Sequence, residues 1–230
     1  MGLYGLLRQR QGMGRPIRIG LIGAGTFGTT FLNQARIVPG MQVAGVADLD
    51  VEKAKQACAA AGWPAETIEM CGSPSAVNSG AARGRVMVTD DAGNLIGADL
   101  DVIVEATGVI EAGTYHAWTA LEAGKHVVMG NVETDALLGH ALKRLADERG
   151  LIYSLAYGDQ PGIICEMIDW ARTVGLEVVC AGKAPVTSPR IATRHPIRCG
   201  TISALPRNKS PPATTIPRCT TPSWTARNLP

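Results

Sequence analysis

The sequence predicts an α/β fold in which a doubly wound parallel sheet is followed by the beginning of a second, α+β domain. Two observations predict this class. Short apolar runs alternate with helical patterns from residue 17 to residue 155. Three glycines with the spacing G-x-G-x-x-G, Gly23, Gly25 and Gly28, separate the first apolar run from the first helical pattern. Strands that alternate with helices in this way form parallel sheets.

The glycine segment predicts a turn that binds the diphosphate of a dinucleotide. Gly23 makes the tight turn after the strand, Gly25 lets the backbone approach the pyrophosphate, and Gly28 lets the helix pack closely on the sheet. The helix then presents unpaired N–H groups and the positive end of its dipole to the phosphates. We expect this part of the site to be lined by Gly23, Ala24, Gly25, Thr26, Phe27 and Gly28.

A second apolar run, residues 41–47, ends at an acidic residue. Asp48 lies 20 residues after Gly28, where a carboxylate at the end of the second strand binds the ribose hydroxyls of a dinucleotide. An acidic residue also suits the N-cap of a helix that starts near Val51; Asp50 fits the cap better and Asp48 the ribose. A carboxylate there disfavours a 2′-phosphate, but nearby basic residues can reverse this preference. The expected cofactor is therefore NAD or NADP.

The remaining segments continue the alternation. Further strands are expected at 85–90, 101–105, 126–129 and 151–155, helices at 26–38, 52–62, 111–123 and 134–149, and a short helix after Ser73. Because ligands bind at the carboxyl ends of parallel strands, we expect Thr107, Gly108 and Asn131 near the nicotinamide half of the cofactor.

Composition argues against several classes of partner. The formal net charge of +2 gives no support for binding to nucleic acid or to a membrane surface. No apolar run approaches the roughly 20 residues of a membrane-spanning helix. Residues 1–15 lack the apolar core and cleavage site of a signal peptide, so we expect a disordered leader. The six cysteines form no CxxC pair, which favours reduced, packed thiols in a cytoplasmic protein and no metal site.

Three histidines have no expected role in the site. His126 begins a strand, and His116 and His140 lie on expected helices without the spacing of metal ligands. Each is therefore interpreted as an ordinary structural or solvated side chain.

Three motifs resemble those of one family. They are Gly-Lys-His-Val-Val at 124–128, which follows a helix ending in Ala-Leu-Glu-Ala, Glu-Ala-Thr-Gly at 105–108, and Gly-Asp-Gln-Pro-Gly at 158–162. Together they resemble the homoserine dehydrogenase-like oxidoreductases that carry a C-terminal SAF domain. This group includes a branch of reductoisomerases that act on 1-deoxy-D-xylulose 5-phosphate. The resemblance implies a Rossmann domain at 16–156, the start of a catalytic domain at 157–183, and a homo-oligomer.

The resemblance also implies further site residues. The turn that contains Gly158 is expected to face the nicotinamide and the substrate, and Lys183 is the candidate catalytic group. A helix at 163–174 and a strand at 176–183 would begin the catalytic domain. One motif departs from the family, because the lysine expected after Asn131 is replaced by Val132. Homoserine is therefore not the expected substrate.

The chain changes character at residue 184. Glu177 is the last acidic residue, and Arg, Pro, Thr and Ser dominate 184–230 without a helical or strand period. A disordered basic tail, a nucleic-acid-binding arm and an out-of-frame translation of the catalytic domain all fit this composition. The out-of-frame interpretation fits best, because one allowed codon choice for 213–228, shifted by one nucleotide, restores acidic and aromatic residues.

These features predict an NAD(P)-dependent oxidoreductase that transfers hydride to or from a small carbonyl or hydroxyl substrate. Two alternatives stay open. One is an enzyme similar to 1-deoxy-D-xylulose 5-phosphate reductoisomerase, and the other is a dinucleotide-binding fragment without turnover. The expected partners are a nicotinamide dinucleotide and a small molecule.

Overall fold

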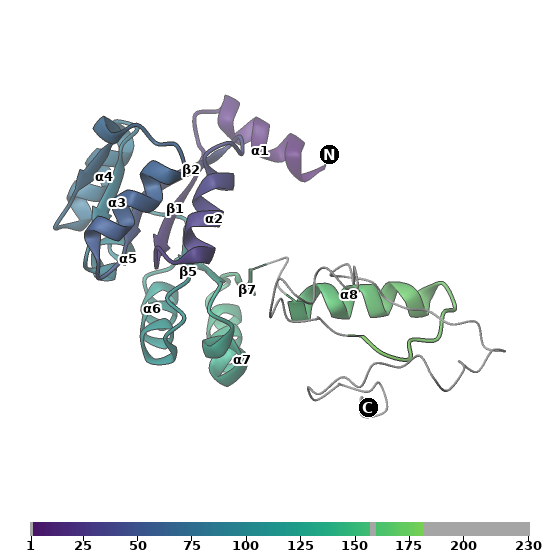
Figure 1. Ribbon diagram of the computed structural model, residues 1–230. Coiled ribbons are helices and arrows are strands. Elements are labelled where there is room, and N and C mark those ends of the chain that lie inside the picture. The colour runs from purple at the N-terminus through teal and green to yellow at the C-terminus, as the bar shows by residue number, and fades with distance from the viewer. Residues whose placement is uncertain (1, 157–159, 182–230) are drawn as a thin grey trace, which may run out of the picture. The chain divides into compact units, whose positions relative to one another are not determined.

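The computed structural model describes residues 2–156 and 160–181 of the chain. The chain divides into two compact units, Met1–Ala156 and Tyr157–Pro230. The first unit holds an extensive sheet with its helices, and the described part of the second holds helix α8 (Gln160–Thr173) (Figure 1).

The strands of the first unit form one parallel sheet in the order β3-β4-β2-β1-β5-β6-β7. The strands are β1 (Ile17–Ile22), β2 (Met41–Ala47), β3 (Ile68–Met70), β4 (Val86–Thr89), β5 (Val102–Glu105), β6 (His126–Met129) and β7 (Tyr153–Leu155). Because β2 lies on one side of β1 and β5 on the other, the strand order reverses between β1 and β5. Ligands of such sheets bind outside the carboxyl ends of the strands at this reversal. The expected doubly wound parallel sheet is confirmed.

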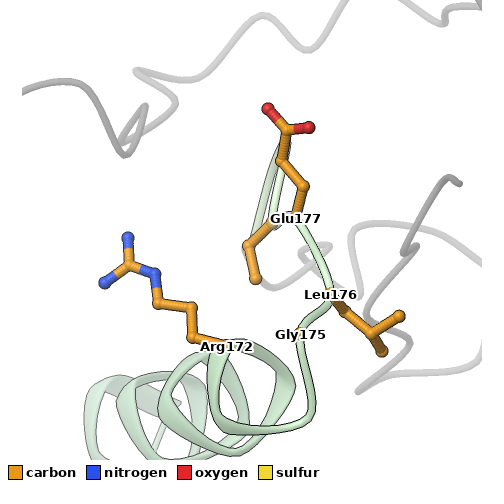
Figure 2. Close-up of a pocket in the computed structure, with 5 residues that line it drawn as sticks. Arg172, Gly175, Leu176 and Glu177 are labelled. Carbon is orange, nitrogen blue, oxygen red and sulfur yellow. The ribbon is translucent and has the colours of Figure 1, made fainter. Parts of the chain in front are cut away.

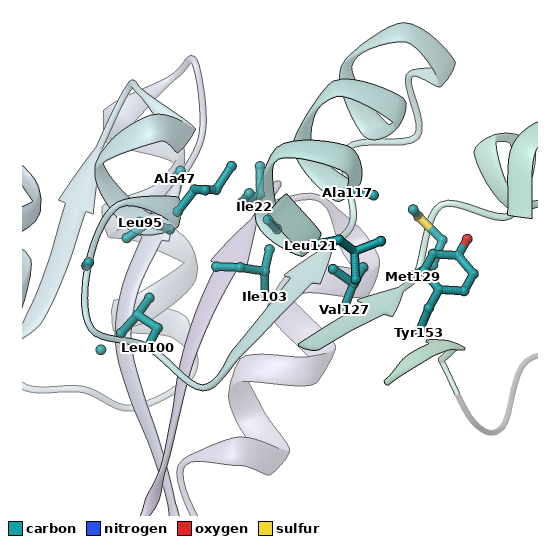
Figure 3. Close-up of a cluster of buried hydrophobic side chains, with 14 of the residues drawn as sticks. Ile22, Ala47, Leu95, Leu100, Ile103, Ala117, Leu121, Val127, Met129 and Tyr153 are labelled. Carbon is teal, nitrogen blue, oxygen red and sulfur yellow. The ribbon is translucent and has the colours of Figure 1, made fainter. Parts of the chain in front are cut away.

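Helices cover both faces of the sheet. One face packs against α2 (Thr26–Ala35) and α3 (Val51–Ala60), and the other packs against α4 (Pro74–Ala82), α5 (Ala92–Ile96), α6 (Ile110–Glu122) and α7 (Val132–Glu148). Successive residues of a strand point to opposite faces. In β1, Ile19 and Leu21 accordingly enter the core on the side of α2 and α3, here called the first core. Ile22 enters the core on the side of α4, α5, α6 and α7, here called the second core. Figure 3 shows the second core, where Ile103 and Leu121 pack between sheet and helices.

Side-chain caps determine where four of these helices begin. Asp50, Ser73, Asp91 and Asn131 each accept a hydrogen bond from a backbone N–H in the first turn of α3, α4, α5 and α7, respectively. The expected cap at Asp50 and the expected helix after Ser73 are confirmed. Helix α7 begins two residues earlier than expected, because Asn131 rather than a later residue is the cap.

One short strand and one short α-helix, besides the 3₁₀ turn at Ala65–Thr67, were not expected from the sequence. Strand β3 pairs along β4 at the edge of the sheet, and α5 is a helix of 5 residues that follows its cap. Neither is long enough to display a period of 2 or 3.6 in its sequence. Both depend on neighbours that are distant in the chain.

The disordered leader expected at 1–15 is wrong for Leu3–Gly12, which form helix α1. The expectation rested on the lack of a signal-peptide core, which does not exclude a helix, and α1 has no buried residue that would mark one face of it as apolar. The helix lies instead against the turn before β2. A Cβ at Gly40 would overlap the carbonyl oxygen of Leu7, so only glycine permits this approach.

The second unit departs from one expectation. Helix α8 agrees with the helix expected at 163–174. No strand is assigned in the described part of the segment expected at 176–183, where Val178 makes an isolated bridge. Leu176 and Val179 are exposed to 39% and 57%, so these two side chains contribute little packing that would stabilise a strand. Within the part of the chain that the structure describes, no helix has the length and apolar character needed to cross a membrane.

The two leucines of α7 that differ most in burial provide a test of the second core. Leu142 is 1% exposed and Leu137 is 66% exposed. We expect Leu142→Ala to lower the free energy of unfolding by about 2–5 kcal/mol, because it leaves a cavity in the core. Leu137→Ala, the same change on the same helix, should alter it by less than about 0.5 kcal/mol. Urea unfolding followed by circular dichroism measures both, and equal losses would contradict this description of α7.

Candidate functional site

Three backbone segments meet where the strand order reverses. The turn after β1 contains Gly23, whose φ is 100°, a value that favours glycine. A Cβ on Gly23 would lie 2.6 Å from the carbonyl carbon and oxygen of Ala106, in the turn after β5. A Cβ on Gly28 would overlap the carbonyl oxygen of Gly23. Glycine at these two positions therefore lets both turns and helix α2 pack backbone against backbone.

Gly25 has a different environment from its two partners in the motif. A Cβ there would meet no atom within 4 Å, so the space beside this residue is open. Gly25 is the N-cap of α2, and no side chain caps the helix or places a negative charge in its first turn. The first N–H groups of a helix carry its positive dipole end. The residues present therefore fit the diphosphate of a dinucleotide at this position.

Asp48 connects the end of β2 to the glycine turn. Its Oδ2 accepts hydrogen bonds from Ala24 N at 2.8 Å and from Lys53 Nζ at 3.3 Å, and its Oδ1 accepts from Asp50 N at 3.0 Å. Burial acts to raise the pKa of this carboxyl, but the two backbone hydrogen bonds and Lys53 outweigh it and lower the pKa overall. Asp48 is therefore held as a carboxylate beside the turn, with its side chain 12% exposed. Its contact with ribose stays a prediction.

A second carboxylate holds the turn after β5. Glu105 is fully buried, and its Oε1 accepts from the backbone N–H of Thr107 at 3.2 Å and from its hydroxyl at 2.5 Å. The following residue, Gly108, has a φ of 71° and open space around it. Thr107 and Gly108 thus lie at the carboxyl end of β5, as the sequence predicts. The hydrogen bonds from Thr107 to the Glu105 carboxylate hold their turn in place.

Asn131 lies beside this turn, but its side chain is 1% exposed. Its Oδ1 accepts from Thr134 N at 3.1 Å, and its Nδ2 donates to the carbonyl of Val109 at 3.0 Å and to Thr107 Oγ1 at 3.4 Å. The amide is therefore occupied by the protein's own groups. The contact that the side chain of Asn131 makes is structural: it holds the end of the turn against the start of α7.

His116 is a residue of this region that sequence reasoning missed. Its Nδ1 lies 3.4 Å from Glu105 Oε1, and its side chain is only 15% exposed. The sequence indicated only that Glu105, at the end of an apolar strand, requires buried donors, and not which residues supply them. Two further histidines of the described residues lie elsewhere: His126 Nδ1 accepts from Ile152 N at 3.0 Å at the start of β6, and His140 is exposed on α7.

Most of the predicted site residues converge at the carboxyl ends of β1, β2, β5 and β6. The exceptions are Gly158 and Lys183, which lie outside the described residues. Among residues 2–156 and 160–181, no group of three His, Cys, Asp or Glu side chains is arranged to hold a metal ion.

A hollow in the second unit does not share these features. It lies after α8 and is bordered by Arg172, Gly175, Leu176 and Glu177. Figure 2 shows that the side chains of Arg172 and Glu177 extend from separate positions on its border.

Two family models match the chain. The model for the NAD-binding domain of homoserine dehydrogenase matches residues 19–155. The model for the catalytic domain of the oxidoreductase DRL matches residues 158–204. This second match extends past residue 183, the boundary expected from composition. Among curated proteins, none matches the chain significantly.

The chain is also similar to solved structures. GenD2 from gentamicin A biosynthesis, in complex with NAD, is 17% identical with a TM-score of 0.50; the match covers 72% of this chain and 42% of that one. An NAD-binding oxidoreductase from Klebsiella pneumoniae is 17% identical with a TM-score of 0.49, covering 70% and 39%. Homoserine dehydrogenase from S. aureus is 21% identical with a TM-score of 0.41, covering 61% and 32%. The chain thus spans less than half the length of these proteins.

The glycine turn can be tested without any ligand. We expect Gly28→Ala to lower the free energy of unfolding by about 1–3 kcal/mol, because its Cβ would force α2 away from Gly23. Gly25→Ala, three residues away, should cost less than about 1 kcal/mol, since its Cβ meets no atom and its φ of −75° suits alanine. Thermal and urea unfolding compare the two variants. A larger loss for Gly25→Ala would contradict the described packing.

Proposed function

The chain belongs to the family of the homoserine dehydrogenase NAD-binding domain, and on this premise we propose that the whole protein is an NAD-dependent oxidoreductase. It transfers hydride between the nicotinamide and a small carbonyl or hydroxyl substrate. The observation that carries the proposal is the backbone contact between Gly23 and Ala106 at the reversal of strand order, beside the open space at Gly25. Dinucleotides bind across this crevice in sheets of this topology.

Each part of the crevice has a role in this proposal. The N-terminus of α2 receives the diphosphate at Gly25. Asp48 accepts hydrogen bonds from the adenosine ribose hydroxyls. These replace its hydrogen bond from the Lys53 ammonium, whereas the hydrogen bond from Ala24 N remains. The turn that carries Thr107 and Gly108 faces the nicotinamide. The bound cofactor supplies the hydride, and these residues hold and orient it.

The preference for NAD over NADP follows from the charge at the end of β2. Asp48 has a lowered pKa and keeps its negative charge at neutral pH, so it repels a 2′-phosphate. Lys53, with its side chain half exposed at 3.3 Å from Asp48, moderates this repulsion. We therefore propose that NADPH binds more weakly than NADH without being excluded.

We propose that the second unit supplies the groups that handle the substrate. Gly158 and Lys183 are proposed to face the substrate, and a homo-oligomer and a cytoplasmic location are proposed for the whole protein. The match to a DRL catalytic domain supports an oxidoreductase rather than a fragment that only binds dinucleotide. Because that match continues to residue 204, a change of reading frame is proposed to lie after it rather than at residue 184.

Titration with reduced cofactors tests the adenosine end of the site. We expect Asp48→Asn to weaken NADH binding by about tenfold, the loss of a charged hydrogen-bond acceptor, and to bring the affinities for NADH and NADPH closer together. Asp50→Asn is the matched control, because asparagine also caps α3 and the ribose site is untouched. Quenching of tryptophan fluorescence by each nucleotide measures the affinities. Equal effects of the two substitutions would contradict the role of Asp48.

Turnover separates the proposed enzyme from a binding fragment. With NADH bound, we expect absorbance at the nicotinamide band to fall when carbonyl substrates are added, with 1-deoxy-D-xylulose 5-phosphate as one of them. Oxidation with this substrate would support the reductoisomerase-like alternative. Binding of NADH without oxidation by any carbonyl substrate would favour the fragment. Failure of both NADH and NADPH to bind would refute the proposed function.

A further inference from the structure

We propose that His116 is a positioning residue for the nicotinamide half of the cofactor. It holds Glu105, and Glu105 holds the turn that carries Thr107 and Gly108. The inference rests on the proposed function and adds to it a pair of residues that never touch the cofactor.

The two oxygens of the Glu105 carboxylate have very different surroundings. Three groups lie within hydrogen-bond distance of its Oε1: the backbone N–H and hydroxyl of Thr107, which donate to it, and Nδ1 of His116. The other oxygen, Oε2, is buried and has no hydrogen-bond partner among the described residues. A buried carboxylate with an unpaired oxygen is a poor way to stabilise a central strand. Its contacts instead fix one turn, which points to a role in placing that turn.

Helix α6 approaches the polar groups around Glu105 most closely at Gly113. A Cβ on Gly113 would lie 2.5 Å from Thr134 Oγ1, 2.6 Å from Asn131 Nδ2 and 3.1 Å from Glu105 Oε2. The helix can approach these polar groups only because Gly113 has no side chain. One turn later along the same helix face, His116 reaches Glu105. The close approach at Gly113 thus determines the position from which His116 acts.

The contact between His116 and Glu105 has one direction that satisfies all of the groups. Oε1 accepts from both groups of Thr107, so Nδ1 of His116 must carry the hydrogen and donate to the same oxygen. Without this donor, the carboxylate can turn its oxygens and release Thr107. The adenosine half binds at the ends of β1 and β2. The hydrogen bonds of the Glu105 and His116 side chains lie instead at the turn after β5 and at α6. Loss of His116 should therefore affect the nicotinamide half alone.

The test compares two ligands on the full chain. NADH contains the nicotinamide, whereas ADP-ribose lacks it and reports on the adenosine half. We expect His116→Leu to weaken NADH binding by about tenfold, as for a lost hydrogen bond to a charged group, and to change ADP-ribose binding by less than about twofold. His116→Asn should recover most of the NADH affinity, because its amide N–H lies near the position of Nδ1. His140→Leu, the same change at an exposed histidine of α7, should alter neither affinity.

A second substitution guards against a variant that does not fold. Glu105→Gln keeps the shape of the side chain and loses its charge, and it should weaken NADH binding in the same selective way. If either folded variant, judged by circular dichroism, weakens both ligands equally, or neither ligand, the positioning role is overturned. If the wild-type chain binds both ADP-ribose and NADH but the variants do not weaken NADH binding selectively, only the positioning role of His116 is overturned. A wild-type chain that binds neither ligand overturns the proposed function as well.

Discussion

The structure depends on a close packing of backbone at the reversal of strand order. The turn after β1, the turn after β5 and the first turn of α2 approach one another at distances that no Cβ allows at Gly23 or Gly28. Interiors are packed at the density of organic crystals, so such a contact has little freedom to relax. The two cores, one on each face of the sheet, hold the strands that bring these turns together. The open space at Gly25 follows from the same geometry.

Two carboxylates extend this arrangement in similar ways. Asp48, after β2, accepts from the backbone N–H of Ala24 in the glycine turn. Glu105, at the end of β5, accepts from the backbone N–H of Thr107 in the second turn. Each acid thus ties an irregular segment to the rigid end of a strand. The two differ in exposure, since the side chain of Asp48 is 12% exposed and that of Glu105 is fully buried. This difference suits one to direct contact with a ligand and the other to support of a turn.

The buried cluster around Glu105 also links two helices to the site. Asn131 joins the turn after β5 to the start of α7, and His116 joins it to α6. A buried polar network stabilises a protein only when nearly all of its donors and acceptors have hydrogen-bond partners. Oε2 of Glu105 is the exception among the described side chains. Precise placement of one turn, rather than stability, accounts for a cluster with this composition.

Local chemistry by itself determined much of this protein. The glycine turn, the buried strands, the caps at Asp50 and Ser73 and the family resemblance all depend on residues that are close together in the chain. Only the tertiary structure decided which distant groups meet. It placed His116 on Glu105, turned the amide of Asn131 inward, paired β3 with β4 and set α1 against Gly40. These contacts join segments whose separation in sequence leaves no periodic or motif signal, so packing between elements, and not local propensity, selects them.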